Sequence, residues 1–248
     1  MPRLGVNIDH VATLRQARGE FYPRLDHAAR ICLENGCDQI TIHLREDRRH
    51  IQDQDVFDVK KITDQFNKPL NLEMGCAEDI LDIAKEARPS WVCLVPEKRE
   101  EKTTEGGLNL LDKSQYDKVK KTCDALKSSI DGVKISLFLE ANEKINDMAI
   151  QMGSSIDAVE VHTGDYAKAY LENNDWNSYL TQFENTYNKL KSKGIHVHAG
   201  HGLTFESTGP LVEQALFEEY NIGHWIISQS VFEGLDKVVR QMVSLIKR

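Results

Sequence analysis

Short apolar stretches alternate with longer amphipathic stretches from one end of the chain to the other. Residues 91–95 (WVCLV) are wholly apolar, as expected for a parallel strand that is covered on both faces. Val56, Val59 and Ile62 instead recur at the spacing of a helix. On this basis, strands are predicted at residues 4–8, 39–44, 69–73, 91–95, 133–139, 158–162, 195–199 and 224–228. Helices are predicted at residues 22–35, 56–66, 78–87, 113–128, 143–152, from the late 170s to 193, 205–220 and 232–247.

This alternation predicts an α/β fold, a single (β/α)8 TIM barrel with extra helices that spans residues 1–248. Strands and helices follow one another without a linker, and 248 residues is close to the usual length of one such barrel. An open, doubly wound flavodoxin-like or Rossmann sheet is the alternative. No GxGxxG motif follows the first strand, so dinucleotide binding has little support.

Composition and charge narrow the class of protein. Apolar residues make up 40% of the chain and charged residues 28%, which is typical of globular proteins. The net charge of −8 gives no general attraction to nucleic acid or to anionic membranes, so any anion site must be local. The five cysteines are scattered without a CxxC pair, which suggests neither disulfides nor zinc. Neither a signal peptide nor a membrane-spanning run is evident, so a cytoplasmic protein is expected.

Polar residues mark the end of nearly every predicted strand. In (β/α)8 barrels the active site is built at the carboxyl ends of the strands. Convergence of several carboxylates and imidazoles there, above an apolar barrel core, would shift their pKa values apart and provide both acids and bases near neutral pH. The residues at these ends are Asn7, Asp9, His10, His43, Arg45, Glu73, Glu97, Glu140, Glu160, His162, His201 and Ser228.

Two of these positions carry the clearest chemical signal. Glu73 ends an otherwise apolar strand, where an unpaired carboxylate would be costly unless it is used or paired. His43 ends a strand that runs directly into the arginine-rich loop 45–50, so a proton-transfer group lies beside groups that bind phosphate or carboxylate. The alternative for the arginines is a solvated loop whose charges pair with one another.

Glycine-rich turns suggest anion sites near the last two strands. Gly200-His201-Gly202 follows the seventh predicted strand, where barrels often bind phosphate through backbone amides. Gly223 precedes the eighth strand as predicted here, so donors at that end would come from Gln229 and Ser230. The segment 97–110 has no predicted structure and contains Gly106-Gly107, which favours a lid or binding loop over a charged surface insertion.

The chain resembles the pyridoxine 5′-phosphate synthase family of deoxyxylulose-dependent vitamin B6 biosynthesis. The similar segments are long, irregular and spread over the whole chain in order. They are GVNIDHVATLRQARG (5–19), TIHLREDRRHI (41–51), NLEM (71–74), CLVPEKREEKTTEGGL (93–108), VHTGDYA (161–167), AGHGLT (199–204) and NIGHWII (221–227). The segment 165–193 has no clear counterpart.

The resemblance implies condensation of 1-deoxy-D-xylulose 5-phosphate with 3-amino-2-oxopropyl phosphate to pyridoxine 5′-phosphate, phosphate and water. It implies no cofactor, no metal, and assembly into a homo-oligomer, an octamer built from dimers. The proton-transfer residues would be His43, Glu73 and His201, with Glu160 as a further site glutamate. The amino-ketone phosphate would contact Asn7, Arg18, Gly202, Gly223 and His224. The deoxyxylulose phosphate would contact Asp9, His10, Arg45, His50 and Thr103.

Three other functions remain open from the residues alone. A phosphate-binding isomerase or aldolase would also need glutamate and histidine at the strand ends. A metal-dependent hydrolase would use His196 and His198, which share one face of a predicted strand. A non-catalytic binding protein would keep the glycines and arginines and tolerate the loss of Glu73.

Overall fold

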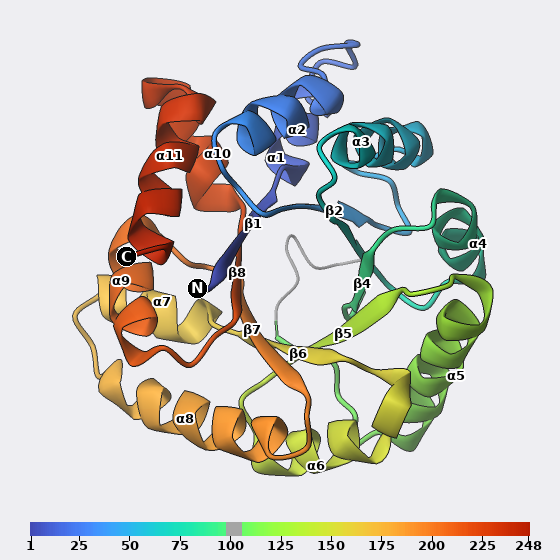
Figure 1. Cartoon of the computed structure of the whole chain (residues 1–248), viewed down its shortest axis with the longest axis vertical. Coiled ribbons are helices and arrows are strands. Elements are labelled where there is room, and N and C mark those ends of the chain that lie inside the picture. The colour runs from blue at the N-terminus through green and yellow to red at the C-terminus, as the bar shows by residue number, and fades with distance from the viewer. Residues whose placement is uncertain (98–105) are drawn as a thin grey trace.

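Parallel strands pair in chain order, and the last pairs with the first, so that the sheet closes into a barrel (Figure 1). A computed structural model describes residues 1–97 and 106–248. Within that part of the chain the fold is the predicted (β/α)8 barrel. Its strands are β1 (Arg3–Asn7), β2 (Gln39–Leu44), β3 (Leu70–Met74), β4 (Trp91–Leu94), β5 (Lys134–Leu139), β6 (Ala158–His162), β7 (His196–Gly200) and β8 (Glu219–Ile222).

Helices surround this barrel on all sides (Figure 1). Three of them, α1, α7 and α10, each begin two residues after a strand ends and are the extra helices of the fold. The helices are α1 (Asp9–Gln16), α2 (Leu25–Glu34), α3 (Asp53–Gln65), α4 (Glu78–Ala87), α5 (Lys113–Ser129), α6 (Glu143–Gln151), α7 (Gly164–Leu171), α8 (Asn177–Lys191), α9 (Phe205–Gln214), α10 (His224–Glu233) and α11 (Leu235–Ile246). A short 3₁₀ helix, Gly153–Ser155, follows α6. In the described residues, no helix combines the length and the apolar character needed to cross a membrane.

The predicted strand at residues 224–228 is wrong. These residues open helix α10, and the eighth strand is Glu219–Ile222, whose first two residues were predicted as the end of a helix and whose last two as a turn. The run is apolar because Ile226 and Ile227 are buried, and a short apolar run does not distinguish a strand from a buried helix. Ser228 therefore ends no strand. Gln229 and Ser230 bond Glu233 and the Ile226 carbonyl within this helix, so they are not the expected donors.

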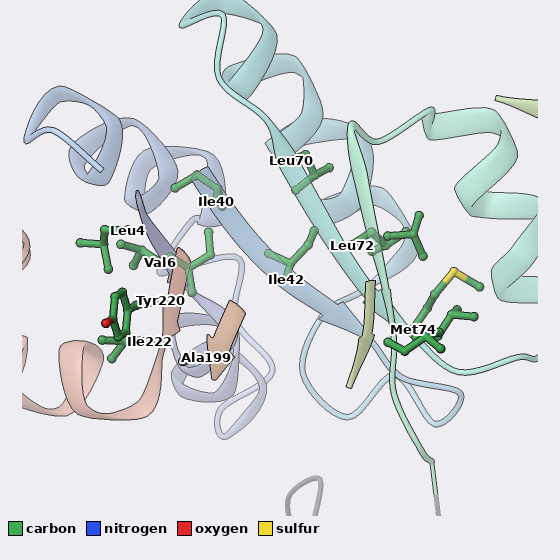
Figure 2. Close-up of a cluster of buried hydrophobic side chains, with 14 of the residues drawn as sticks. Leu4, Val6, Ile40, Ile42, Leu70, Leu72, Met74, Ala199, Tyr220 and Ile222 are labelled. Atoms are coloured by element: carbon green, nitrogen blue, oxygen red, sulfur yellow. The ribbon is translucent and has the colours of Figure 1, made fainter. Parts of the chain in front are cut away.

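The expected apolar core inside the barrel is also wrong. Strand β2 alternates Ile40, Ile42 and Leu44 with Gln39, Thr41 and His43, and all six are buried. The apolar set packs in the cluster of Figure 2 with residues of the neighbouring strands. The polar set bonds across the barrel: the Gln39 amide donates to Glu219 at 2.8 Å, and Thr41 Oγ1 donates to Asn221 at 3.1 Å. The apolar core thus lies between strands and helices, and the interior is polar.

Alternation along the strands places the functional side chains. Because successive side chains on a strand point to opposite faces, the residues that alternate with the apolar set point into the barrel. Along β8, Tyr220 and Ile222 are buried among apolar residues, whereas Asn221 reaches Glu160 on β6 inside the barrel. The same geometry carries polar side chains up to the carboxyl ends of the strands.

Candidate active site

A cavity of about 350 Å³ opens at the carboxyl ends of the strands. Among the residues that the structure describes, it brings together every predicted site residue except Arg18. The lining residues are Asn7, Asp9, His10, His43, Arg45, His50, Glu73, Glu160, His201, Gly202, Gly223 and His224, together with Val95, Phe138 and Asn221.

Arg18 is the predicted site residue that the structure places away from this cavity. Arg18 lies on the exposed turn that follows α1 and does not line the cavity. Thr103 lies outside the described residues, as does most of the predicted lid, so neither prediction is tested.

Three carboxyl groups meet on the floor of the cavity. The Asn7 amide lies 3.0 Å from an Asp9 oxygen and 3.5 Å from a Glu73 oxygen. Burial, followed by the negative charges of Glu160 and Asp9, raises the pKa of Glu73 well above its usual value. Burial likewise raises the pKa of Asp9, against the opposing effect of His43. Such carboxyl groups retain a proton to higher pH than a solvated acid, so they can donate as well as accept.

Glu160 extends from β6 into the polar interior, below the open part of the cavity. The Asn221 amide donates to its Oε2 at 2.7 Å. Burial raises the pKa of Glu160 to about 8, and Glu219 adds to the rise while the Asn221 hydrogen bond opposes it. A Cβ atom on Gly200 would lie 1.9 Å from Glu160 Oε1, so the neighbouring strand needs glycine at this position.

His43 is held by acidic groups from two other elements. Its backbone N–H donates to Asp9 Oδ1 at 2.8 Å. Its Nε2 lies 3.1 Å from Oε1 of Glu97, which comes shortly after β4. Glu97 was recognised only as a strand-end residue. Its role beside His43 could not be read from the sequence, because the two residues are far apart in the chain.

His201 and His162 form a pair of imidazoles, apart from His43. Their ring centroids are 5.1 Å apart, and His162 Nδ1 lies 2.8 Å from Glu140 Oε1. Burial lowers the pKa of His201 to about 4, and His162 acts in the same direction, so His201 is neutral near pH 7. A Cβ on Gly164 would come within 2.6 Å of His162 and 2.9 Å of His201. His162 and Glu140 were noted at strand ends but were given no role.

A third group of imidazoles lies at the rim of the cavity. The rings of His10 and His224 are 4.9 Å apart, and those of His10 and His50 are 6.0 Å apart. Thr13 Oγ1 lies 3.3 Å from His10 Nδ1 and 3.1 Å from His50 Nδ1. Burial, with the neighbouring imidazoles, lowers the pKa of His10 to about 4. Thr13 could not be identified as a site residue from the sequence, because threonine is common inside helices.

Two features of the rim suit an anion. Arg45 is buried and lines the cavity, where a guanidinium suits a phosphate. Its Nε has no hydrogen-bond partner within the described part of the chain and lies 3.7 Å from Asp47 Oδ1, at ion-pair distance. Helix α10 begins directly after Gly223 without a side-chain cap, which leaves N-terminal amides to bind a phosphate. Gly223 therefore follows its strand and lies at the cavity, as the resemblance implied.

The other arginines of the loop pair with acids. Arg48 bonds Asp53 and Asp79, both at 2.8 Å, and Arg49 bonds Asp47 at 2.7 Å. The alternative interpretation of a self-paired surface loop thus applies to Arg48 and Arg49. It applies in part to Arg45, whose Nε lies 3.7 Å from Asp47 Oδ1.

The His196–His198 pair does not reach the cavity. His196 bonds Glu218, and His198 packs against Trp91 with ring centroids 5.2 Å apart. In the described residues, the group with the geometry to ligate a metal is instead Asp9, His43 and Glu73, whose ligand atoms lie within 4.8 Å of one another. These are the same groups that are placed to move protons.

Solved structures share the fold at low sequence identity. Tryptophan synthase from M. tuberculosis has a TM-score of 0.66 at 9% identity, covering 100% of this chain and 93% of that chain. Thiamine phosphate pyrophosphorylase from Pyrococcus furiosus has a TM-score of 0.60 at 12% identity, covering 99% of this chain and 95% of that chain. At such identities the likeness concerns the barrel alone.

Sequence relatives extend over the whole chain. Pyridoxine 5′-phosphate synthase from Coxiella burnetii is 46% identical over 246 residues, which cover 99% of this chain and 98% of the relative. The enzyme of that name from Aquifex aeolicus is 43% identical over 249 residues, with 99% of each chain covered. The family model described as "Pyridoxal phosphate biosynthesis protein PdxJ" matches residues 4–248. The chain is an enzyme of the PdxJ family.

Proposed function

We propose that the chain is a pyridoxine 5′-phosphate synthase that condenses 1-deoxy-D-xylulose 5-phosphate with 3-amino-2-oxopropyl phosphate. The products are pyridoxine 5′-phosphate, inorganic phosphate and water. One observation carries the proposal: one cavity joins half-buried Glu73, buried Glu160 and two separate histidines to anion-binding groups at its rim. The names of the relatives support the same activity.

The two substrates would be held by their phosphate groups at different parts of the rim. The amino-ketone phosphate would bind at the N-terminus of α10, beside Gly223 and His224, with Gly202 and Asn7 nearby in the cavity. The deoxyxylulose phosphate would bind Arg45, His50 and His10, and a guanidinium can pair with a phosphate through two parallel hydrogen bonds. Arg18 and Thr103 remain predicted contacts of the two substrates.

Proton transfers would be shared among the buried groups. Ring closure requires addition of an amine to a ketone, removal of a proton from carbon, loss of water and a final aromatisation, so a single base is insufficient. Glu73, with its raised pKa, would alternate between acid and base. His43 and His201 would serve different faces of the intermediate, because they come from β2 and from the turn after β7. Glu160 would stabilise positive charge that develops near it, or hold a proton at neutral pH.

No redox cofactor is required by this reaction. The atoms of the two substrates equal those of pyridoxine 5′-phosphate, one phosphate and two molecules of water, so no external oxidant or reductant takes part. The proposed partners are therefore small phosphorylated molecules, and the net charge of −8 disfavours nucleic acid. The cytoplasmic location stays a prediction.

Assembly into a homo-oligomer is also proposed. Large apolar side chains lie exposed around α1 and α10: Leu14 is 55% exposed, Phe21 78%, Tyr22 57%, Val231 67% and Phe232 85%. We call these five residues the α1/α10 patch. Grouped apolar exposure of this kind is unusual on a monomer and suits a second copy of the chain. The octamer built from dimers rests on the resemblance alone.

The two-substrate assay tests the function. The purified chain is mixed with both substrates in the presence of a chelator, and pyridoxine 5′-phosphate absorbance and released phosphate are followed together. Equal amounts of both products, with none when either substrate is omitted, would support the synthase. Absence of both products would leave the barrel in place and direct attention to an isomerase or aldolase.

A further inference from the structure

The carboxylate of Glu97 is fixed in a buried contact with the His43 ring. Glu97 Oε1 lies 3.1 Å from His43 Nε2, and the two side chains are 7% and 6% exposed. Glu97 is not among the residues that line the cavity, so it would act on the substrates only through His43. A contact this well shielded from water keeps a defined geometry, unlike an exposed ion pair.

Two backbone amides hold the other lone pairs of this carboxylate. Glu46 N–H donates to Oε2 at 2.9 Å, and Gly75 N–H donates to Oε1 at 3.1 Å. A Cβ on Gly75 would lie 3.1 Å from Glu97 Cδ, so glycine permits this close approach. Burial alone would raise the pKa of Glu97, but the hydrogen bonds from His43, Glu46 and Gly75 hold it below its usual value. Glu97 is therefore ionised at neutral pH.

An ionised carboxylate has only acceptors, so the hydrogen between these two residues must belong to His43 Nε2. When the ring is neutral, its Nδ1 is then unprotonated. Within residues 1–97 and 106–248, no protein hydrogen bond to His43 Nδ1 is found, and the ring lines the cavity. Nδ1 is thus the nitrogen that remains for a substrate.

We propose that Glu97 is a positioning residue that fixes neutral His43 as the Nε2–H tautomer and so makes Nδ1 the proton acceptor toward the substrate. The proton-transfer role rests on the proposed function, whereas the tautomer does not depend on it. Other ionisable groups near the ring are Asp9 and Glu73. Asp9 accepts a hydrogen bond from the backbone N–H of His43 and not from its ring. Glu97, by contrast, bonds a ring nitrogen.

The tautomer can be measured directly in the free enzyme. Protein labelled with ¹⁵N-histidine is examined by long-range ¹H–¹⁵N correlation at a pH where the ring is neutral, and His43→Gln identifies the His43 signals. The expected result is a protonated Nε2 and an unprotonated Nδ1. In Glu97→Gln the His43 signals should move toward a mixture of tautomers. The glutamine amide can donate a hydrogen bond to Nε2 as well as accept one from it. A protonated Nδ1 in the wild-type enzyme overturns the proposal.

Kinetics separate positioning from folding. Glu97→Gln should lower kcat by about 10- to 100-fold, a part of what general acid–base catalysis contributes, and change KM by less than about threefold. Gly75→Ala keeps the charge of Glu97, but its Cβ would displace the Glu97 carboxylate, so this variant should also lower kcat. It replaces Glu97→Gln as the test if Glu97→Gln does not fold. Glu86→Gln removes an exposed carboxylate from α4, away from this contact, and should change neither kcat nor the His43 signals. Unchanged kcat and tautomer in Glu97→Gln would refute the proposal.

Discussion

Glu160 illustrates how one buried side chain combines packing with proton chemistry. It is 3% exposed, and the space that it occupies excludes any side chain at Gly200 on the adjacent strand. Its carboxyl is held by the Asn221 amide, and burial raises its pKa to about 8. A group whose pKa is higher in the folded chain than in the unfolded chain stabilises the fold while it is protonated and loses that contribution as pH rises.

The first prediction follows from this shift. Between about pH 4.5, where the unfolded side chain ionises, and about pH 8, Glu160 should make the wild-type enzyme progressively less stable. Glu160→Gln removes the titration, so its melting temperature relative to wild type should rise from pH 5 to pH 8. Calorimetry at a series of pH values measures this difference. A difference that is constant with pH would contradict the raised pKa.

Individual site residues could be predicted from the sequence, but the partners of the site histidines could not. His43, Glu73 and His201 could be identified because each ends a strand or lies in a glycine turn. Glu97 and Glu140 also end strands, yet their contacts with His43 and His162 depend on how the barrel closes. Thr13 bridges two histidines from inside a helix, and its sequence position carries no such signal.

At the scale of elements, most strands and helices follow from the pattern of apolar residues. The helix 78–87 and the strand 158–162 have the predicted bounds. The error lies at β8 and α10, where an apolar run belongs to a helix and the polar-looking Glu219-Tyr220-Asn221-Ile222 forms the strand. The strand looks polar because Glu219 and Asn221 face the barrel interior. The prediction assumed an apolar interior, so it did not expect polar residues in a buried strand. Helices α1 and α7 were missed because each is only 8 residues long and follows a strand almost directly.

The start of α10 gives the second prediction. A Cβ on Gly223 would lie 2.9 Å from Asn7 Cβ, so Gly223→Ala must move either the N-terminus of α10 or Asn7. This terminus is the proposed site of the amino-ketone phosphate. The KM for the amino-ketone substrate should therefore increase about tenfold, which corresponds to roughly 1.4 kcal/mol of lost binding free energy. Steady-state kinetics with each substrate varied in turn measures the effect. An equal increase for both substrates, or for neither, would argue against this placement.

Over the whole molecule, apolar and polar groups are separated in an unusual way. The apolar core lies between the strands and their helices, while the barrel interior holds a hydrogen-bonded polar network. Both faces of such a strand can be buried, one in the apolar core and one in the barrel interior. The polar side chains of the interior must then form hydrogen bonds with one another. The family assignment makes the chain an enzyme, and the cavity at the carboxyl ends of the strands is the candidate site for its activity.

The α1/α10 patch leads to the prediction for the whole molecule. Phe232 is 85% exposed, and a charge there should weaken contact with a second copy of the chain. Light scattering after gel filtration should give a mass above that of one chain for wild type and a lower mass for Phe232→Glu. Leu171→Glu, at an exposed leucine outside the patch, is the matched control and should retain the wild-type mass. A wild-type enzyme that runs as a single chain would rule out assembly through this patch.

The most direct measurement is the rate of pyridoxine 5′-phosphate formation by Glu73→Gln. Glu73 lies among Asp9, Asn7 and Glu160 with a strongly raised pKa, and the account assigns it both donation and acceptance of protons. An amide of the same shape can do neither, so kcat should fall by about 10²- to 10⁴-fold while both substrates still bind. Glu86→Gln, at an exposed position of α4, should retain wild-type activity as the control. A Glu73→Gln enzyme that forms the product at the wild-type rate would contradict the account.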